Sequence, residues 1–158
     1  AAFRRVWPDA DDVAQTMFRW FLDGDLDTLY SDVMNTLQQL AARNVQLGVL
    51  SNYAPTLERR LVQLGIRHYF GFVVVSSLVG LSKPDPAIFN MAVTHVSCPR
   101  SSVLYVGDNP EIDIEGAERA GLPAVLLDRE NQHIGLRCLR VHSLFELPDL
   151  IDNGHAVV

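Results

Sequence analysis

Residues 103–109 read VLYVGDN, an apolar run that ends in a glycine and two polar residues. Such a run, rich in residues that favour strands and apolar at almost every position, is typical of a strand buried on both faces. Four similar runs occur along the chain, and helical patterns separate them. This alternation predicts an α/β domain with a parallel sheet and helices on both faces. The expected strands cover residues 46–51, 72–76, 103–107, 124–127 and, more weakly, 139–141.

The segments between the runs carry apolar residues at spacings of three and four, as helices with one buried face do. Gly65 and Gly121 follow two of these segments and are expected to end the helices. Near the N-terminus, residues 13–21 predict an amphipathic helix, and the acidic residues 23–27 predict a loop. The expected helices cover or begin in residues 33–41, 57–64, 86–93, 112–120 and 144–150.

Composition excludes several classes of protein. With 158 residues, 48% of them hydrophobic and 20% charged, the chain is large and apolar enough for one globular domain. Its net charge of -6 argues against nucleic acid or an anionic membrane as the main partner. The two cysteines, Cys98 and Cys138, suggest neither a disulfide framework nor a zinc site. No apolar run reaches the roughly 20 residues of a membrane span, so a soluble cytoplasmic protein is expected.

Polar residues that follow the apolar strands are the candidates for chemistry, because ligands bind at the carboxyl ends of strands in open α/β sheets. The hydroxyl of Ser51 and the adjacent Asn52 could hydrogen-bond a phosphoryl oxygen. Lys83 could neutralise an anion. Asp108 and Asp113 offer the hard oxygen ligands that Mg²⁺ prefers.

Each of these residues, taken alone, has an ordinary structural explanation. Ser51 could cap a helix, and Lys83 could be an exposed loop lysine. Asp108 and Asp113 could lie in a turn and on the solvated side of a helix. Their order along the chain is therefore more informative than any one of them.

A strand ending at Ser51, then Lys83-Pro84, then a strand ending in Gly107-Asp108 with Asp113 five residues on, resembles the second, third and fourth motifs of the haloacid dehalogenase (HAD) superfamily of hydrolases. The likeness extends over residues 29–150. It implies a HAD-like Rossmannoid core.

The resemblance also implies Mg²⁺-dependent hydrolysis of a small phosphorylated metabolite through an aspartyl-phosphate. In that family an aspartate of the first strand attacks phosphorus, and a second aspartate two residues later protonates the leaving group. By motif match, Ser51, Lys83 and Asp113 are catalytic, Ser51, Asn52 and Lys83 bind substrate, and Asp108 and Asp113 bind Mg²⁺. Such a site acts through positioning and electrostatics, as phosphoryl transfer requires.

The first motif of the family has no good counterpart. Asp23-Gly24-Asp25 offers an Asp-x-Asp before Ser51, but Arg19 interrupts the apolar run ahead of it. We therefore expect residues 1–28 to be the remnant of a helical cap or a linker, and residues 29–158 to be a core without its first strand. The sequence then represents part of a longer enzyme and is expected to be inactive alone.

Loss of a central strand has an energetic consequence. In the family this strand lies between the strands expected at residues 46–51 and 103–107. Each backbone group left buried and unpaired there would cost about 1–3 kcal/mol. Three solutions remain open: the two strands pair directly, residues 1–28 substitute, or a missing segment or second copy completes the sheet in a homodimer or strand-exchanged assembly.

A second function is compatible with the same residues. The chain could be a non-catalytic α/β module that binds phosphate and a metal ion without turnover. Such a module would bind phosphate, would lose affinity when Lys83 is replaced, and would form no phosphoaspartate in any context.

Overall fold

The computed structural model describes residues 28–153. The predictions that concern residues 1–27, namely the amphipathic helix, the Asp-x-Asp segment and the cap remnant, lie outside the described residues. The strands are β1 (Leu47–Ser51), β2 (Phe70–Val75), β3 (Tyr105–Gly107), β4 (Ala124–Leu127) and β5 (Leu139–Val141). The helices are α2 (Val33–Ala42), α3 (Leu57–Gln63), α4 (Ser76–Val79), α5 (Pro86–Val93), α6 (Glu115–Arg119) and α7 (Leu147–Asp152).

Apart from the short helix α4, which the sequence did not predict, the strand and helix predictions agree with this architecture, with one further informative difference. The helix expected over residues 112–120 begins as a π-helical turn, Pro110–Ile114, and becomes α-helical only in α6. The side chain of Asn109 caps this turn by accepting a hydrogen bond from the Ile112 N–H at 2.9 Å. This turn is wider than an α-helical turn, and it brings Asp113 back toward the end of β3, where Asp113 forms part of the candidate site.

All strand pairs are parallel, but within residues 28–153 they form two separate sheets. β1 pairs with β2, and β3 pairs with β4, which in turn pairs with β5. Ser51 lies opposite Val75 and Gly107 opposite Leu126, so each sheet has an even carboxyl edge. No hydrogen bond of the described chain joins β1 to β3. Direct pairing of these two strands, one of the three alternatives, is therefore wrong for this structure.

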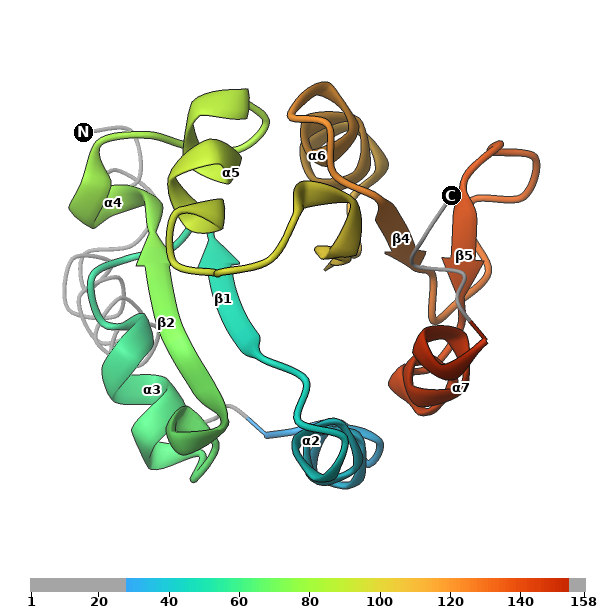
Figure 1. Cartoon of the computed structure of the whole chain (residues 1–158), viewed down its shortest axis with the longest axis horizontal. Coiled ribbons are helices and arrows are strands. Elements are labelled where there is room, and N and C mark those ends of the chain that lie inside the picture. Colours follow the sequence, from blue (N-terminus) through green and yellow to red (C-terminus); the bar gives the residue numbers. More distant parts are fainter. Residues whose placement is uncertain (1–27, 154–158) are drawn as a thin grey trace, which may run out of the picture.

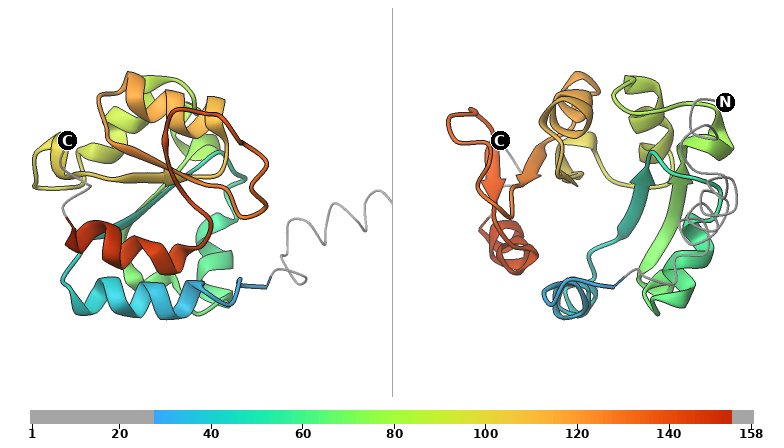
Figure 2. Two further views of the ribbon diagram at one scale, coloured as in Figure 1. Left: turned by 90° about the vertical axis from the view of Figure 1, so that its right-hand side faces the viewer. Right: turned by 180° about the vertical axis from the view of Figure 1, so that it is seen from behind.

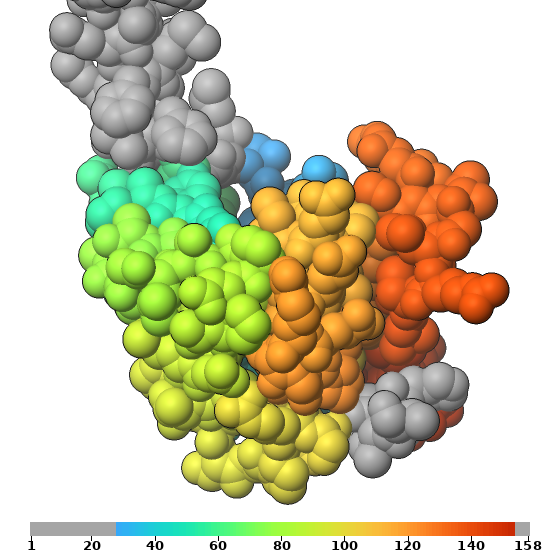
Figure 3. Space-filling view, turned by 90° about the horizontal axis from the view of Figure 1, so that it is seen from above, coloured from blue at the N-terminus to red at the C-terminus, as the bar shows by residue number. Residues whose placement is uncertain are grey.

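Helices cover both faces of the two sheets (Figures 1 and 2). α5 and α6 lie over one face, and their atoms meet along the surface seen in Figure 3. α2 and α7 lie side by side beneath the other face, as the left panel of Figure 2 shows. The doubly covered parallel α/β fold predicted from the sequence is confirmed.

The buried core differs between the two faces. On the α5 and α6 face one cluster reaches from Val74 of β2 through Phe89 of α5 to Ala117 of α6. On the α2 and α7 face there are two clusters, one around Leu37 beside β1 and one around Leu147 beside β3 and β4. The two half-sheets thus share a core on one side only.

A buried ion pair joins the start of α2 to the far half of the molecule. Asp32 accepts hydrogen bonds from Arg129 Nη1 and Nη2 at 2.7 and 3.1 Å, from Ser143 Oγ at 2.7 Å and from the Leu144 N–H at 2.8 Å. The Arg129 guanidinium, helped by Ser143 and Leu144 and opposed by burial, lowers the pKa of Asp32 to about 2.

Replacing Asp32 by asparagine is expected to lower the free energy of unfolding at neutral pH by about 3 kcal/mol, because Arg129 then loses its carboxylate partner. The folded pKa of about 2 lies below the ordinary 3.8, so the stabilisation is complete above pH 4 and disappears as the pH falls toward 2. Urea unfolding at pH 7 and pH 3 measures both effects. Asp149→Asn, at an exposed carboxylate of α7, is the matched control. Equal losses from the two variants would contradict the prediction.

Candidate active site

The carboxyl end of β1 is tied to the segment around Lys83 by one side chain. Asn52, the residue after Ser51, donates from Nδ2 to the Lys83 carbonyl and accepts at Oδ1 from the Lys83 N–H, both at 2.8 Å. The Tyr53 N–H donates to Ser76 Oγ at 3.1 Å, which fixes the same loop to the end of β2. These bonds determine where the Lys83 backbone lies relative to Ser51.

Lys83 points from this anchored backbone toward the end of β3. Its Nζ donates to Asp113 Oδ1 at 2.5 Å and to the Tyr105 hydroxyl at 3.1 Å. The Lys83 side chain is 11% exposed and that of Asp113 only 3%. The result is a nearly buried ion pair that spans the two half-sheets.

Asp113 uses both carboxylate oxygens within the protein. Oδ1 accepts from Lys83 and from the Tyr105 hydroxyl at 3.1 Å, and Oδ2 accepts from the N–H groups of Asp108 and Asn109 at 3.2 and 3.0 Å. Asp113 therefore fixes the ammonium of Lys83 and the loop that follows β3 at the same time.

The ionisation of this group follows from its partners. Burial alone would raise the pKa of Asp113, but the Lys83 ammonium, the Asn109 amide and the Tyr105 hydroxyl together hold that pKa below its ordinary value. Burial, reinforced by the negative charge of Asp113, raises the pKa of Tyr105 well above its usual range. At neutral pH the site consequently contains a carboxylate and a neutral phenol that donates to it.

Gly107 allows this arrangement because it lies directly under Asp113. A Cβ built on Gly107 would lie 2.4 Å from the Asp113 Cβ. No side chain larger than hydrogen fits there without displacing the buried carboxylate.

Replacing Gly107 by alanine is expected to destabilise the protein by about 2 kcal/mol, because the added methyl overlaps a buried, fully bonded side chain. Gly71→Ala is the control: it lies in β2, and its added Cβ would meet nothing nearer than 3.7 Å. Thermal unfolding of the two variants gives the comparison. A Gly107 variant as stable as the Gly71 variant would show that Asp113 moves aside at little cost.

Asp108 differs from Asp113 in having a free carboxylate. Asp108 is exposed at the end of β3, and within residues 28–153 nothing hydrogen-bonds its side-chain oxygens. No group of three or more His, Cys, Asp or Glu side chains in that part of the chain could hold a metal ion. A single free carboxylate fits Mg²⁺, which takes one or two protein carboxylates and completes its shell with water and phosphate.

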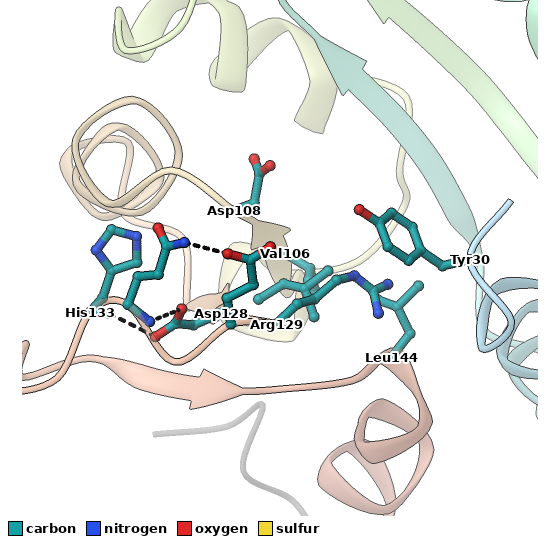
Figure 4. A pocket seen from close by; sticks show the side chains of 11 residues that line it. Tyr30, Val106, Asp108, Asp128, Arg129, His133 and Leu144 are labelled. Atoms are coloured by element: carbon teal, nitrogen blue, oxygen red, sulfur yellow. Dashed lines mark hydrogen bonds between the residues drawn. The ribbon is translucent and has the colours of Figure 1, made fainter. Parts of the chain in front are cut away.

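A pocket of about 600 Å³ opens beside Asp108. Figure 4 shows Asp108 from the end of β3, Tyr30 from the segment before α2 and Arg129 from the loop after β4 around the same space. The Arg129 guanidinium lies 4.1 Å from the centre of the Tyr30 ring. The Asp108 carboxylate, a group suited to bind a metal ion, therefore faces a space large enough for a small molecule.

The structure brings the predicted residues together through a continuous set of hydrogen bonds. Asn52 joins Lys83, Lys83 joins Asp113, and Asp113 joins Asp108. The hydroxyl of Ser51, adjacent to Asn52, has no partner within residues 28–153. The roles assigned to these residues from the motifs stay predictions.

Sequence reasoning missed three supporting residues: Tyr105, Gly107 and Asn109 are not among the predicted site residues. The sequence offered a signal for Tyr105. Its side chain ends in a hydroxyl within an otherwise apolar run, and it lies two positions before Gly107, so the two residues share one face of the strand. The backbone role of Asn109 had no signal, because it depends on how Asp113 folds back.

The family model of haloacid dehalogenase-like hydrolases matches residues 9–127. The chain therefore belongs to this family, as the order of its motifs predicted. No helix within residues 28–153 is long and apolar enough to cross a bilayer.

The chain spans only part of the length of each relative that it matches. The chain is similar to a phosphoserine phosphatase from Thermus thermophilus, with 39% identity over 102 residues that represent 64% of this chain and 41% of the relative. It resembles the structure of a HAD phosphatase from Thermococcus onnurineus (TM-score 0.74, 25% identity, 78% of this chain and 58% of that one). It also resembles a 2-haloacid dehalogenase from Pseudomonas syringae (TM-score 0.73, 29% identity, 92% and 63%).

Proposed function

We propose that residues 28–153 form the phosphoryl-binding and metal-binding part of a phosphomonoester hydrolase that acts on a small phosphorylated metabolite. The observation that carries this proposal is the Asn52, Lys83, Asp113 network, which holds a nearly buried ammonium between two strand ends. The phosphatases among the similar proteins support it.

Two groups are suited to bind the phosphoryl oxygens. An ammonium has three N–H donors, and Lys83 uses two of them on Asp113 and Tyr105, which leaves one for a ligand. The free hydroxyl of Ser51 supplies a second donor at the same edge. Asn52 has both polar side-chain atoms engaged by the Lys83 backbone, so we assign it a positioning role.

Asp108 is the residue proposed to hold Mg²⁺, which would neutralise phosphate charge when bound. Asp113 has four hydrogen bonds to donors of the protein. We therefore propose that it acts on the metal site only indirectly, by fixing the Asp108 backbone and the Lys83 ammonium.

The attacking carboxylate comes from outside residues 28–153 in this proposal. Such a carboxylate would form a bond to phosphorus as the bond to the leaving oxygen breaks, and the leaving oxygen would take a proton from a second, protonated carboxyl group, which becomes a carboxylate. Water would then attack the phosphorus and give a proton to the second carboxylate, and the bond between phosphorus and the first carboxylate would break, which releases inorganic phosphate and restores both groups. Lys83 and Ser51 would stabilise the charge on the phosphoryl oxygens in both steps.

Hydrolysis of p-nitrophenyl phosphate tests the proposal. The chain alone is expected to show negligible turnover, while the chain preceded by an apolar strand ending in Asp-x-Asp is expected to hydrolyse the ester with Mg²⁺. Inactivity of a folded extended protein that still binds phosphate by calorimetry would favour the non-catalytic module instead. Ser101→Ala, at an exposed hydroxyl that lines neither pocket, is the control.

A further inference from the structure

The hydroxyl of Tyr105 lies beside the ion pair between Lys83 and Asp113. The Tyr105 oxygen is 3.1 Å from Lys83 Nζ and 3.1 Å from Asp113 Oδ1, and these two atoms are 2.5 Å from each other. The three polar atoms therefore form a closed triangle in which each group contacts the other two.

The chemistry of the three groups determines the direction of each hydrogen bond. An ammonium can only donate, and a carboxylate can only accept. The Tyr105 hydroxyl must therefore donate its proton to Asp113 and accept a hydrogen bond from Lys83. A phenylalanine of the same shape would supply neither bond, so the polar atom of Tyr105 has a function that filling the space does not explain.

The contact with Tyr105 restricts where the ammonium can lie. Lys83 ends in a flexible chain of four methylene groups, and a single ion pair would let Nζ move over the surface of the Asp113 carboxylate. Its two acceptors belong to different elements, since Tyr105 lies in β3 and Asp113 in the turn before α6. Together they confine Nζ, which gives the remaining N–H of Lys83 a defined direction.

The ring of Tyr105 is held in place by Phe89 of α5. The two ring centroids are 5.1 Å apart with an angle of 73° between the planes, an edge-to-face contact, and Phe89 is fully buried. The Tyr105 N–H donates to the Pro123 carbonyl at 2.9 Å, so the backbone is fixed as well. Because ring and backbone are both anchored, the hydroxyl can hold the ammonium instead of following it.

Gly116 of α6 completes this support. A Cβ built on Gly116 would lie 2.8 Å from Cε2 of Phe89 and 3.1 Å from Cα of Pro84, the residue after Lys83. The absence of a side chain therefore lets α6 approach the Phe89 ring and the Pro84 backbone closely. The turn that leads into α6 carries Asp113, so one continuous element contacts both the ammonium of Lys83 and the residue next to it.

We propose that Tyr105 is a positioning residue for phosphoryl binding. Its hydroxyl fixes the Lys83 ammonium so that the third N–H faces the ligand, and the packing of Phe89 against Gly116 keeps that hydroxyl in place. The inference rests on the proposed function, because it assigns a phosphoryl oxygen as the ligand of this N–H. Tyr105 acts through Lys83, and we assign it no contact with substrate.

Tyr105→Phe removes the hydroxyl and keeps the ring, and inorganic phosphate is the probe. Calorimetry on the full chain is expected to show about tenfold weaker phosphate binding, the scale of one hydrogen bond to a charged group. Mg²⁺ affinity, measured without phosphate, should be unchanged, because the proposed metal ligand is the free carboxylate of Asp108. Tyr69→Phe, in the helical turn before β2, is the matched control and should change neither affinity.

The ammonium itself gives a readout that does not depend on phosphate. Lys83 is the only lysine in the sequence, so protein made with lysine carrying ¹⁵N at Nζ gives a single side-chain NMR signal. We expect Tyr105→Phe to speed exchange of the ammonium hydrogens with water by about tenfold, because one of their two acceptors is lost. If the exchange responds in this way but the unchanged chain binds no phosphate, the proposed function fails while the hold of Tyr105 on Lys83 stands.

A double-mutant cycle tests the support from Phe89. Gly116→Ala keeps every polar group of the site but adds a methyl group that must displace the Phe89 ring, and we expect about threefold weaker phosphate binding. Combined with Tyr105→Phe it should cause no further loss, because the hydroxyl that it misplaces is already absent. Gly71→Ala, whose added Cβ would meet nothing nearer than 3.7 Å, is the control.

Three results would overturn the inference. A Tyr105→Phe variant that binds phosphate as tightly as the unchanged chain would show that the hydroxyl does not position Lys83 for the ligand. Equal losses of phosphate and Mg²⁺ affinity would show a general loss of structure at the site. Additive losses in the cycle would show that Gly116 acts by a route other than Tyr105.

Discussion

Replacing Lys83 by methionine should lower phosphate affinity and turnover more than any other single change at the site. The variant keeps the aliphatic stem but loses the positive charge aimed at the phosphoryl group. In the chain preceded by an apolar strand ending in Asp-x-Asp we expect turnover of p-nitrophenyl phosphate to fall by about a thousandfold, the range seen when a preorganised electrostatic contact is removed. In the chain alone, calorimetry should show loss of phosphate binding.

Stability separates the electrostatic role of Lys83 from a merely structural one. Lys83→Met leaves Asp113 buried without its cation, which should cost about 3–5 kcal/mol of unfolding free energy. Adding Asp113→Asn should recover part of that loss, because no unpaired buried charge remains, while phosphate binding stays absent. If the double variant regained phosphate binding as well, Lys83 would not be the phosphate ligand.

Replacing Asp113 by asparagine alone should destabilise the protein by about 3 kcal/mol, since a neutral amide cannot balance the Lys83 ammonium and accept from two backbone N–H groups equally well. The pKa of Asp113 is held below its ordinary value, so its contribution is present above that value and is lost as the pH falls through the folded pKa. The free energy of unfolding of the variant should therefore change less between pH 7 and acidic pH than that of the unchanged protein.

Urea unfolding over that pH range measures the difference, and Glu115→Gln, an exposed carboxylate two residues away, is the control for loss of charge. Metal affinity provides a second readout. Asp113→Asn should weaken Mg²⁺ binding less than Asp108→Asn, because the proposed ligand is Asp108. An Asp113 variant with the larger loss would place that carboxylate on the metal.

The order of motifs explains why the family and the general fold could be predicted. Apolar runs such as residues 103–107 form buried strands wherever they lie in a parallel sheet, and the polar residues after them must reach its carboxyl edge. Position relative to the strand ends and the order of the motifs identify the candidate site residues Ser51, Lys83, Asp108 and Asp113. The absence of a suitable strand before Ser51 left three ways to complete the sheet open, and direct pairing of the two flanking strands was one of them.

Other features required the folded chain. The motif match predicted that both Asp108 and Asp113 bind the metal ion, but the π-helical turn at Pro110–Ile114 directs Asp113 inward to four hydrogen-bond donors and leaves the Asp108 carboxylate free. Asn52 carries two polar atoms that any ligand could use, and only the position of Lys83, 31 residues later, commits them.

Local pattern determined which segments become strands and which residues reach the carboxyl edge, because both depend on neighbours along the chain. The tertiary structure alone decided how carboxylates, amides and the ammonium pair, and that β1 and β3 stay apart, because those outcomes depend on contacts between segments distant in sequence. Hydrogen-bond partners and sheet edges are properties of the packed chain, so no spacing rule encodes them.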